Sequence, residues 1–301
     1  MMKIILLILF AGSVMMAQSA GNSGLSFLKF GLGARNIAMG DLGVAAANDL
    51  SALNYNPSLL AVNPKTQLSF THNSFFTDLN SEMFSGSFSI FNLPFAVGIN
   101  STNVSDIEVR TNPGDAVSTF SAHYFAASIS TGIKLSERIN FGFTYKYLYE
   151  NLFSDNAGGY GLDFGVIYLS PVNGLNFGIS YRNIGSMNEL RSEPTKLPSD
   201  LRAGAAYDFS FVNSKFNFSI TAGFQKYTLQ NESHLHFGGE IFYDKFFALR
   251  AGYAGGYDSK NISAGFGICW KGINLDYAYV PVKYGLGDSH IISLTYTFEQ
   301  D

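Results

Sequence analysis

The chain has 301 residues, of which 14% are charged and 15% aromatic, and it carries 31 glycines and a net charge of −4. Soluble domains average about 25% charged residues, so the composition is unusually apolar and aromatic for a protein dissolved in water. The mildly acidic balance and the lack of a basic stripe argue against a nucleic-acid partner. No apolar run after the N-terminus reaches the ~20 residues of a membrane helix.

The first 17 residues have the pattern of an export signal. Lys3 supplies the positive charge, the run from Ile4 to Val14 is apolar, and we predict cleavage after Ala17. No cysteine lies near that position, which argues against a lipid anchor. An uncleaved membrane anchor is the alternative, although the run is too short to span a bilayer. The chain is therefore expected to be exported.

Residues 18–65 differ from everything that follows, because they are rich in glycine and alanine and show no strict alternation. Asp49 can cap a short helix that ends at Asn54. The Asn56-Pro57 pair should end that helix or start another, because proline restricts the residue before it. We expect a compact, partly helical segment that lies against or inside the remainder of the fold.

From residue 66 to residue 298 the chain alternates apolar and polar side chains, as β-strands with two unlike faces do. The pattern is clearest over 138–150, where an apolar face rich in phenylalanine and tyrosine alternates with a polar one and Leu148 is the exception. We predict fourteen strands, at residues 66–75, 83–91, 94–103, 119–133, 138–149, 159–169, 174–184, 200–211, 215–227, 233–243, 246–253, 261–270, 273–279 and 289–298.

The connections distinguish a membrane barrel from a soluble sandwich, the two environments that fit such strands. Short connections, such as 92–93 and 271–272, alternate in strict order with generally longer ones, such as 104–118, 150–158 and 185–199. Bacterial outer-membrane barrels have tight periplasmic turns, long extracellular loops and an even number of strands. A Greek-key sandwich has no reason to sort its loops in this way.

The fold class that follows is all-β, a transmembrane antiparallel β-barrel of about fourteen strands over residues 66–301. Glycines such as Gly142 and Gly223 fall on the inner face and leave room inside the barrel. We predict that residues 18–65 fill that room as a plug inserted from the periplasmic end, after removal of residues 1–17. The expected location is the outer membrane of a Gram-negative bacterium, in contact with its lipid.

A plug inside a barrel needs its charges paired, because an unpaired buried charge is costly. The candidate lumen residues are Arg35, Asp49, Asn54, Asn56 and Pro57 in the plug and Arg202, Glu240 and Arg250 in the barrel, with Lys146, Asp163, Arg182, Asp208 and Asp276 as further inward charges. They predict a structural ion-pair network that fixes the plug. The alternative is a network that contacts a ligand or gates the pore.

No catalytic constellation is apparent, and we predict no enzyme, no cofactor and no metal site. His234 and His236 share one face of a strand, a spacing that can bind a metal in pairs, but no third ligand accompanies them. The segment 31–36 fails the dinucleotide fingerprint, and Gly-x-Ser-x-Gly does not occur. Cys269 is expected to pack as a small apolar side chain.

Both ends of the chain resemble the PorV/PorQ family. Residues 24–40 (GLSFLKFGLGARNIAMG) with residues 48–57 (NDLSALNYNP) are similar to the family's N-terminal signature. Residues 275–281 (LDYAYVP) with residues 286–298 (LGDSHIISLTYTF) are similar to its last two strands. The resemblance implies the fourteen-strand, FadL-like barrel of the long-chain fatty acid transporters, with an N-terminal hatch in the lumen.

The same resemblance implies a non-enzymatic part in type IX protein secretion and in the attachment of cargo to the cell surface. The implied partners are secretion-system proteins and cargo with C-terminal sorting domains, which the long loops 104–118 and 185–199 would meet outside the cell. The alternative function is a FadL-like channel for fatty acids or other hydrophobic solutes, in which the plug moves. An outer-membrane enzyme is a third hypothesis, for which no nucleophile and base can be placed.

Overall fold

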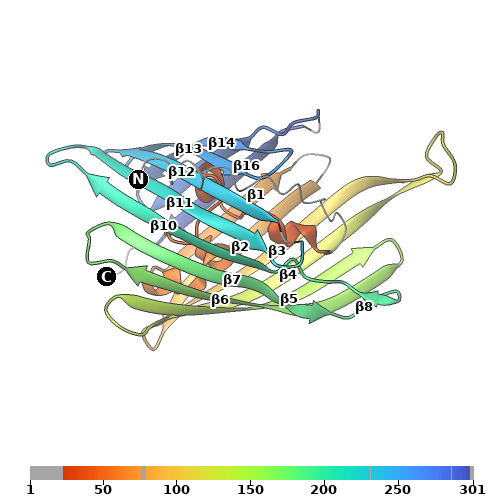
Figure 1. Ribbon diagram of the computed structural model, residues 1–301, viewed down its shortest axis with the longest axis horizontal. Coiled ribbons are helices and arrows are strands. Elements are labelled where there is room, and N and C mark those ends of the chain that lie inside the picture. The colour runs from red at the N-terminus through yellow and green to blue at the C-terminus, as the bar shows by residue number, and fades with distance from the viewer. Residues whose placement is uncertain (1–22, 76–78, 231, 286, 299–301) are drawn as a thin grey trace, which may run out of the picture.

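The computed structural model of the protein describes residues 23–75, 79–230, 232–285 and 287–298. Fourteen of its strands close into one antiparallel barrel, in which each strand pairs with the next barrel strand along the chain and β1 pairs with β16 (Figure 1). The fold class predicted from the alternation is confirmed. The predicted export signal lies outside the described residues.

The barrel strands agree closely with the predicted ones. They are β1 (Gln67–Ser74), β2 (Leu79–Ile90), β3 (Leu93–Val109), β4 (Ser118–Lys134), β5 (Ile139–Leu152), β6 (Asp155–Leu169), β7 (Leu175–Met187), β10 (Asp200–Ser210), β11 (Phe216–Tyr227), β12 (Ser233–Tyr243), β13 (Phe247–Gly255), β14 (Ile262–Trp270), β15 (Ile273–Val280) and β16 (Ser289–Thr297). The short strands β8 (Glu189–Leu190) and β9 (Glu193–Pro194) form a separate two-stranded sheet.

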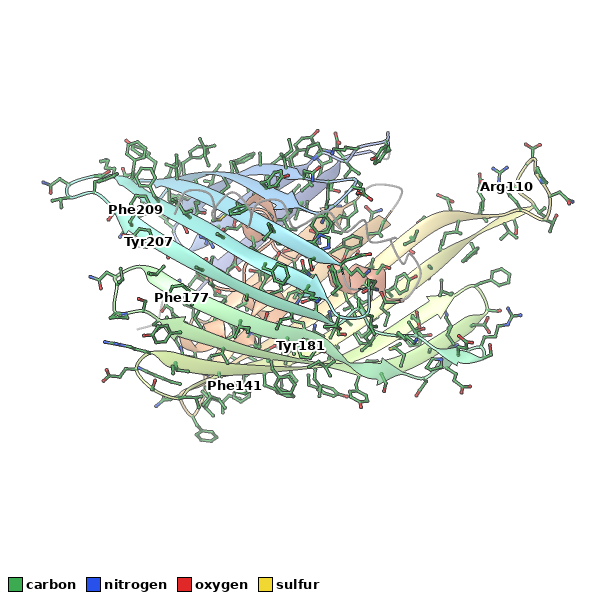
Figure 2. The ribbon with its side chains drawn as sticks, in the orientation of Figure 1. Arg110, Phe141, Phe177, Tyr181, Tyr207 and Phe209 are labelled. Atoms are coloured by element: carbon green, nitrogen blue, oxygen red, sulfur yellow. The ribbon has the colours of Figure 1, made fainter. Side chains whose placement is uncertain are left out.

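The alternation along each strand sorts apolar side chains outward and polar ones inward. On β5, Tyr147 is 47% exposed on the outer face, whereas Thr144 is fully buried on the inner face. Figure 2 shows Phe141, Phe177 and Tyr207 on the outside of the barrel. A water-soluble protein would bury such rings, so the outer wall is built for acyl chains.

The two rims of the barrel differ, as predicted. Two-residue turns close β2–β3 and β14–β15, and Phe91, Asn92, Lys271 and Gly272 all have positive φ, as type I′ hairpins require. At the opposite rim the β3–β4 hairpin projects well beyond its neighbours, at the right of Figure 1. We take the rim with the tight turns as periplasmic, following the rule for outer-membrane barrels.

Several predicted loops are shorter than expected, because strands extend into them: residues 79–82 belong to β2, 104–109 to β3 and 185–187 to β7. The largest difference is at the β5–β6 connection. Residues 150–158 are not a long connection, because β5 and β6 continue through them and leave only residues 153–154 between the strands. Leu152 pairs with Asp155 at the end of this ladder. Polar residues that suggest a loop in a membrane protein form ordinary strand here, because the ladder continues past the membrane into water, where an apolar face is no longer required.

The wall is uneven in height. The strands β3 to β6 are 14 to 17 residues long, whereas β1 and β13 to β16 are 8 or 9 residues long. The tall side carries the projecting hairpin, and the low side carries the last strands of the chain (Figure 1).

Residues 23–66 form the plug, which appears in red and orange inside the barrel in Figure 1. Its elements are η1 (Ser26–Lys29), α2 (Ala34–Ala38), α3 (Ala52–Tyr55) and η2 (Pro57–Ala61). Among the described residues, no helix has the length and apolar character needed to cross a membrane. The predicted helix ending near Asn54 corresponds to α3, and Asn56-Pro57 starts η2, with Pro57 at the first helical position that proline favours.

The plug spans the height of the lumen instead of entering from the periplasmic end. The Gly24 N–H donates to the carbonyl of Lys196, 3.1 Å away, between β9 and β10 at the long-loop rim. The chain then descends to β1 at the opposite rim. Leu148, the exception to the alternation of β5, turns inward because it packs in a cluster with Leu25 and Phe27 of the plug.

Glycines on the inner wall allow the plug to lie against the strand backbone. A Cβ atom at Gly142 would lie 2.0 Å from the Ser58 nitrogen and 2.2 Å from the Pro57 carbonyl carbon. At Gly165 it would lie 1.9 Å from Asn56 Oδ1. The inward glycines therefore leave room for the plug, as the sequence predicts.

We expect Gly142→Ala to lower the stability of the protein by about 1–3 kcal/mol, because the added methyl group overpacks the plug against the wall. The matched control is Gly239→Ala, whose Cβ would lie 4.0 Å from its nearest neighbour, the Ser219 carbonyl oxygen. Thermal unfolding in detergent, together with protease cleavage within residues 23–66, measures the effect. Equal melting temperatures for the two variants would show that the close contact with the plug is absent.

The plugged lumen as the candidate functional site

Charged side chains meet in the lumen, and a first cluster joins the plug to β12, β13 and β15. Arg35 Nη2 and Nε lie 2.8 and 3.0 Å from the two carboxylate oxygens of Glu240. Arg250 Nε lies 2.5 Å from Glu240 and its Nη1 lies 2.7 Å from Asp276. Arg35 also donates to the carbonyl of Ala46 at 2.9 Å. Burial alone would lower the pKa of Arg35, but the Glu240 carboxylate outweighs burial and raises it.

A second cluster holds α3 from β7 and β10. Arg182 donates to both oxygens of Asp200, at 3.0 and 2.5 Å, and to the backbone carbonyl of Asn54 at 2.5 Å. Arg202 lies 3.5 Å from the same Asp200 and donates to the carbonyl of Asp41 at 3.1 Å. All three charged side chains are fully buried. Asp200 is absent from the sequence-based candidates, although its shared parity with Arg202 could have identified it.

Asn56 is the polar anchor of the plug and is fully buried. Its side-chain amide donates to the carbonyls of Val44, at 2.8 Å, and Val166, at 3.2 Å, while its oxygen accepts from the Ser58 N–H and hydroxyl. Asp49 accepts from the backbone N–H of Ser51 at 2.9 Å, just before α3. The predicted plug residues therefore brace its turns, and Asn56 also reaches the wall.

Tyr55, another residue missing from the sequence-based candidates, lies at the centre of the plug. Its hydroxyl donates to Asp41 at 2.6 Å, and its ring lies 5.3 Å from the Arg202 guanidinium carbon. Burial, reinforced by the Asp41 carboxylate, raises the pKa of Tyr55 well above its usual value, so the ring stays neutral. The cation–π contact adds a further link between plug and wall.

Two other predicted charges behave differently from each other. Lys146 lies 2.6 Å from Asp163 and donates to Asn183 at 2.8 Å, so this pair crosses the wall from β5 to β6 and β7. Asp208 is exposed near the tight-turn rim and makes no ion pair with any residue that the structure describes. It therefore lies outside the network that holds the plug.

Of the two histidines, His236 contacts the plug, whereas His234 packs against a tyrosine of the barrel. His236 Nδ1 lies 2.6 Å from the Gly40 carbonyl, and His234 stacks on Tyr257 with ring centroids 3.7 Å apart. Within the described part of the chain, no group of three or more His, Cys, Asp or Glu side chains is arranged to hold a metal ion.

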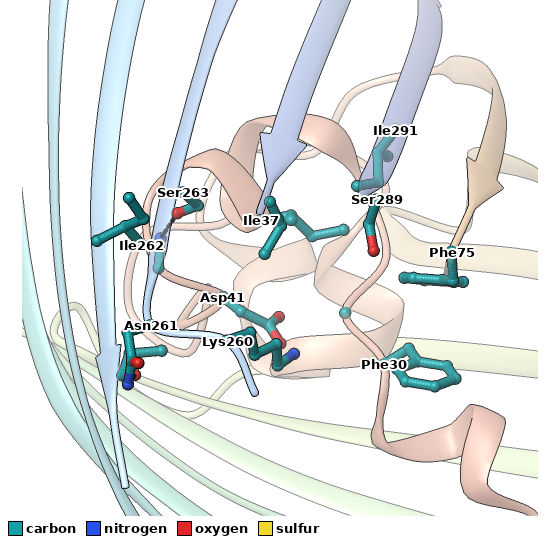
Figure 3. A pocket seen from close by; sticks show the side chains of 14 residues that line it. Phe30, Ile37, Asp41, Phe75, Lys260, Asn261, Ile262, Ser263, Ser289 and Ile291 are labelled. Atoms are coloured by element: carbon teal, nitrogen blue, oxygen red, sulfur yellow. Dashed lines mark hydrogen bonds between the residues drawn. The ribbon is translucent and has the colours of Figure 1, made fainter. Parts of the chain in front are cut away.

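Little free space remains between the plug and the half of the wall nearer the long-loop rim. One cavity, of about 40 Å³, is mainly apolar. Figure 3 shows its lining, in which Phe30, Ile37, Phe75 and Ile291 lie near polar residues such as Asp41 and Lys260. A second cavity, beside Leu53 and Met83, measures about 30 Å³. An apolar cavity that admits benzene is nearer 150 Å³, so neither holds an aromatic ring in this conformation.

Glu240→Ala tests whether the first cluster fastens the plug. The change leaves Arg35 and Arg250 side by side without their shared carboxylate, and the loss of one partner of a buried pair costs about 3–5 kcal/mol. We expect a lower melting temperature in detergent and faster proteolysis of residues 23–66. The control Asp244→Ala breaks the exposed Lys215–Asp244 pair and should change neither measurement appreciably. A plug that stays protected in Glu240→Ala would contradict a fastening role.

Three solved structures share this architecture. The TodX monoaromatic hydrocarbon channel deltaS2 mutant aligns with a TM-score of 0.64 at 12% identity, over 89% of this chain and 99% of that chain. The Pseudomonas putida toluene transporter TodX gives 0.62 at 13% identity, over 89% and 97%. A Pseudomonas aeruginosa FadL homologue gives 0.52 at 12% identity, over 85% and 95%. At such identities the likeness shows the fold alone, which confirms the FadL-like barrel. No curated protein sequence matches the chain.

Sequence comparison identifies the family. The family model described as "Type IX secretion system protein PorV" matches residues 15–232, which include the whole described plug and the barrel through β11. The match covers more than half of the chain and includes the N-terminal signature on which the resemblance was based. The chain belongs to the PorV family of type IX secretion system proteins.

Proposed function

We propose that this protein is a non-enzymatic docking component of type IX secretion, which holds secretion-system proteins and cargo with C-terminal sorting domains at the cell surface. Membership of the PorV family and the outer-membrane barrel support the proposal. The observation that carries it is the β3–β4 hairpin, which projects from the outer rim of a barrel whose lumen holds a plug. We also propose that an export signal ending at Ala17 delivers the chain, so that plug (18–65) and barrel (66–301) form the mature protein.

The hairpin has unused capacity to bind a partner. Its neighbours β2 and β5 pair with it only as far as Val104 and Ala122, whereas β3 and β4 continue to pair with each other up to Val109 and Ser118. Both outer edges of this extension therefore lack a paired strand among the described residues. Exposed strand edges accept an additional strand, a common mode of peptide recognition.

Apolar side chains gather at the same rim. Val117 and Phe153 are each 69% exposed, and Phe153 packs edge-on against Phe120 with ring centroids 5.5 Å apart. Arg110 marks the hairpin tip in Figure 2. Because the strands here extend past the membrane, these rings face water, where an exposed apolar patch is typical of a protein interface.

The second candidate function is a channel for hydrophobic solutes. The fold shared with a toluene transporter favours it. However, the cavity of Figure 3 is too small for such a solute, and transport would require the plug to break two buried charge clusters. Uptake of a labelled fatty acid by parent and deletion strains distinguishes the hypotheses, and we expect equal uptake.

The double variant Val117→Ser/Phe153→Ser tests the docking surface. We expect several-fold less cargo with C-terminal sorting domains on the cell surface, because the variant removes apolar area that a partner would bury. Quantitative labelling of intact cells measures the cargo, and the outer-membrane level of the barrel serves as the reference.

The matched control is Phe211→Ser/Val212→Ser, which removes two exposed apolar side chains at the opposite rim. Cargo display should remain at the parental level in this control. Parental display in Val117→Ser/Phe153→Ser as well would refute the hairpin as the docking surface, and parental display in a full deletion strain would refute the secretion role altogether.

A further inference from the structure

A polar chamber lies at the tight-turn rim, the opposite end from the hairpin. Its volume is about 570 Å³, within the range of about 300–1,000 Å³ that small-ligand sites occupy. The lining includes Asn48 of the plug, Asn173 after β6, and residues of β10, β11 and β12. A second cavity of about 220 Å³ shares Arg35, Asn48 and Asp208 with it. The chamber takes no part in the function proposed above.

One wall of the chamber is a row of three polar side chains on adjacent strands. Asp208 on β10 is opposite Ser219 on β11, which in turn is opposite Glu240 on β12. Opposed residues of antiparallel strands lie about 5 Å apart, so the two carboxylates flank the serine hydroxyl. Glu240 is bound to Arg35 and Arg250, whereas Asp208 has no ion-pair partner within the described residues.

Ser219 shows that the row is incomplete. Its side chain lines the chamber and the residue is only 5% exposed, yet Oγ has no hydrogen-bond partner among the residues described. Buried polar atoms are nearly always satisfied, so the orphan hydroxyl of Ser219 indicates a missing partner in the chamber, next to the exposed carboxylate of Asp208. A cationic donor suits this position best, because charge-assisted hydrogen bonds to a carboxylate are the strong ones.

The rest of the lining agrees with this charge. The charged side chains that line the two cavities are three acids, Asp49, Asp208 and Glu240, and two bases, Arg35 and Lys65, which leaves a net charge of −1. Asn48, Asn173 and Asn217 make no side-chain hydrogen bond to any described residue. A carboxamide carries both a donor and an acceptor, the complement of a peptide group.

We propose that this chamber binds a basic peptide segment, with an arginine or lysine side chain bonded to Asp208 and Ser219 and the peptide backbone bonded to the asparagines. The tight-turn rim faces the periplasm, so the segment belongs to a periplasmic polypeptide. The size of the chamber suits a few residues of extended chain and excludes a folded domain.

The experiment uses the full-length protein in detergent micelles at low ionic strength, with acetyl-Ala-Arg-Ala-amide as the probe and calorimetry as the measurement. We expect saturable binding with one peptide per chain. The citrulline analogue keeps the shape and loses the charge, so it should bind at least about tenfold more weakly. Asp208→Asn should weaken binding of the arginine peptide about tenfold, whereas Asp244→Asn, which changes an exposed acid at the same rim, should leave it unchanged.

A variant that gains affinity serves as a second test, because misfolding can weaken binding but cannot strengthen it. Asn217→Asp adds a second unpaired carboxylate to the chamber and should tighten binding several-fold. Heat-modifiable mobility on gels verifies that each variant retains the closed barrel. Absence of saturable binding to the parent protein, or equal affinities of Asp208→Asn, Asn217→Asp and Asp244→Asn, would overturn the proposal. Argininamide binding as tightly as the peptide would overturn the peptide assignment and identify a site for small cations.

Discussion

Lipid tails offer no hydrogen bonds, so every polar group within the membrane must find its partner inside the protein. The pairing of β1 with β16 meets this requirement for the backbone, because it leaves the sheet without an edge. In the lumen, contacts with carboxylates and carbonyls meet it in part for the buried arginines. Two arginines, Arg35 and Arg182, each donate to a carboxylate and to a backbone carbonyl. Arg202 donates to a backbone carbonyl and lies 3.5 Å from a carboxylate. Together these three side chains connect the wall to the plug.

Because the charge clusters hold the plug in the lumen, we expect the protein to act through its surface and not by conducting solutes through the barrel. A buried ion pair adds little stability compared with an apolar contact, but breaking one is expensive. The ion pairs therefore add little to the net stability of the protein, but they keep the plug in one position, because any movement that separates the partners leaves unpaired charges in the lumen. Structures with the same barrel include proteins named as hydrocarbon transporters. A shared fold carries different functions when the working surfaces differ, and here the distinctive surfaces are the two rims.

Much of the fold follows from one repeating feature of the sequence, the period-two alternation. It fixed all fourteen barrel strands and the tight turns, because a lipid-facing surface tolerates little deviation. It failed where that constraint ends. Residues 150–158 are strand, although their polarity suggests a loop, because strands beyond the membrane need no apolar face. Leu148 broke the pattern for a reason that only the packing of the plug reveals.

The sequence predicts which charged residues face the lumen, but it does not predict which acid pairs with which base. A buried plug requires paired charges, so parity identified Glu240, Arg250 and Arg202, and the lone arginine of the plug identified Arg35. Which acid meets which base depends on where the plug lies in the lumen, and periodicity carries no such information. Tyr55 was missed for this reason, whereas Asp200 shares the parity of Arg202 and was identifiable from the alternation. Asp208 was expected in the network and lies outside it.

The uneven wall has a consequence for the surrounding lipid. An eight-residue strand such as β15 is roughly 27 Å long and, at a tilt near 40°, rises roughly 20 Å, less than the ~25 Å apolar band of an outer-membrane barrel. The seventeen-residue strands on the far side have no such deficit. The bilayer must thin locally or the cylinder must lean toward its low side. Either response makes the lipid around the low side of the barrel differ from the lipid around the tall side. Neighbouring membrane proteins are therefore expected to prefer one side of the barrel over the other.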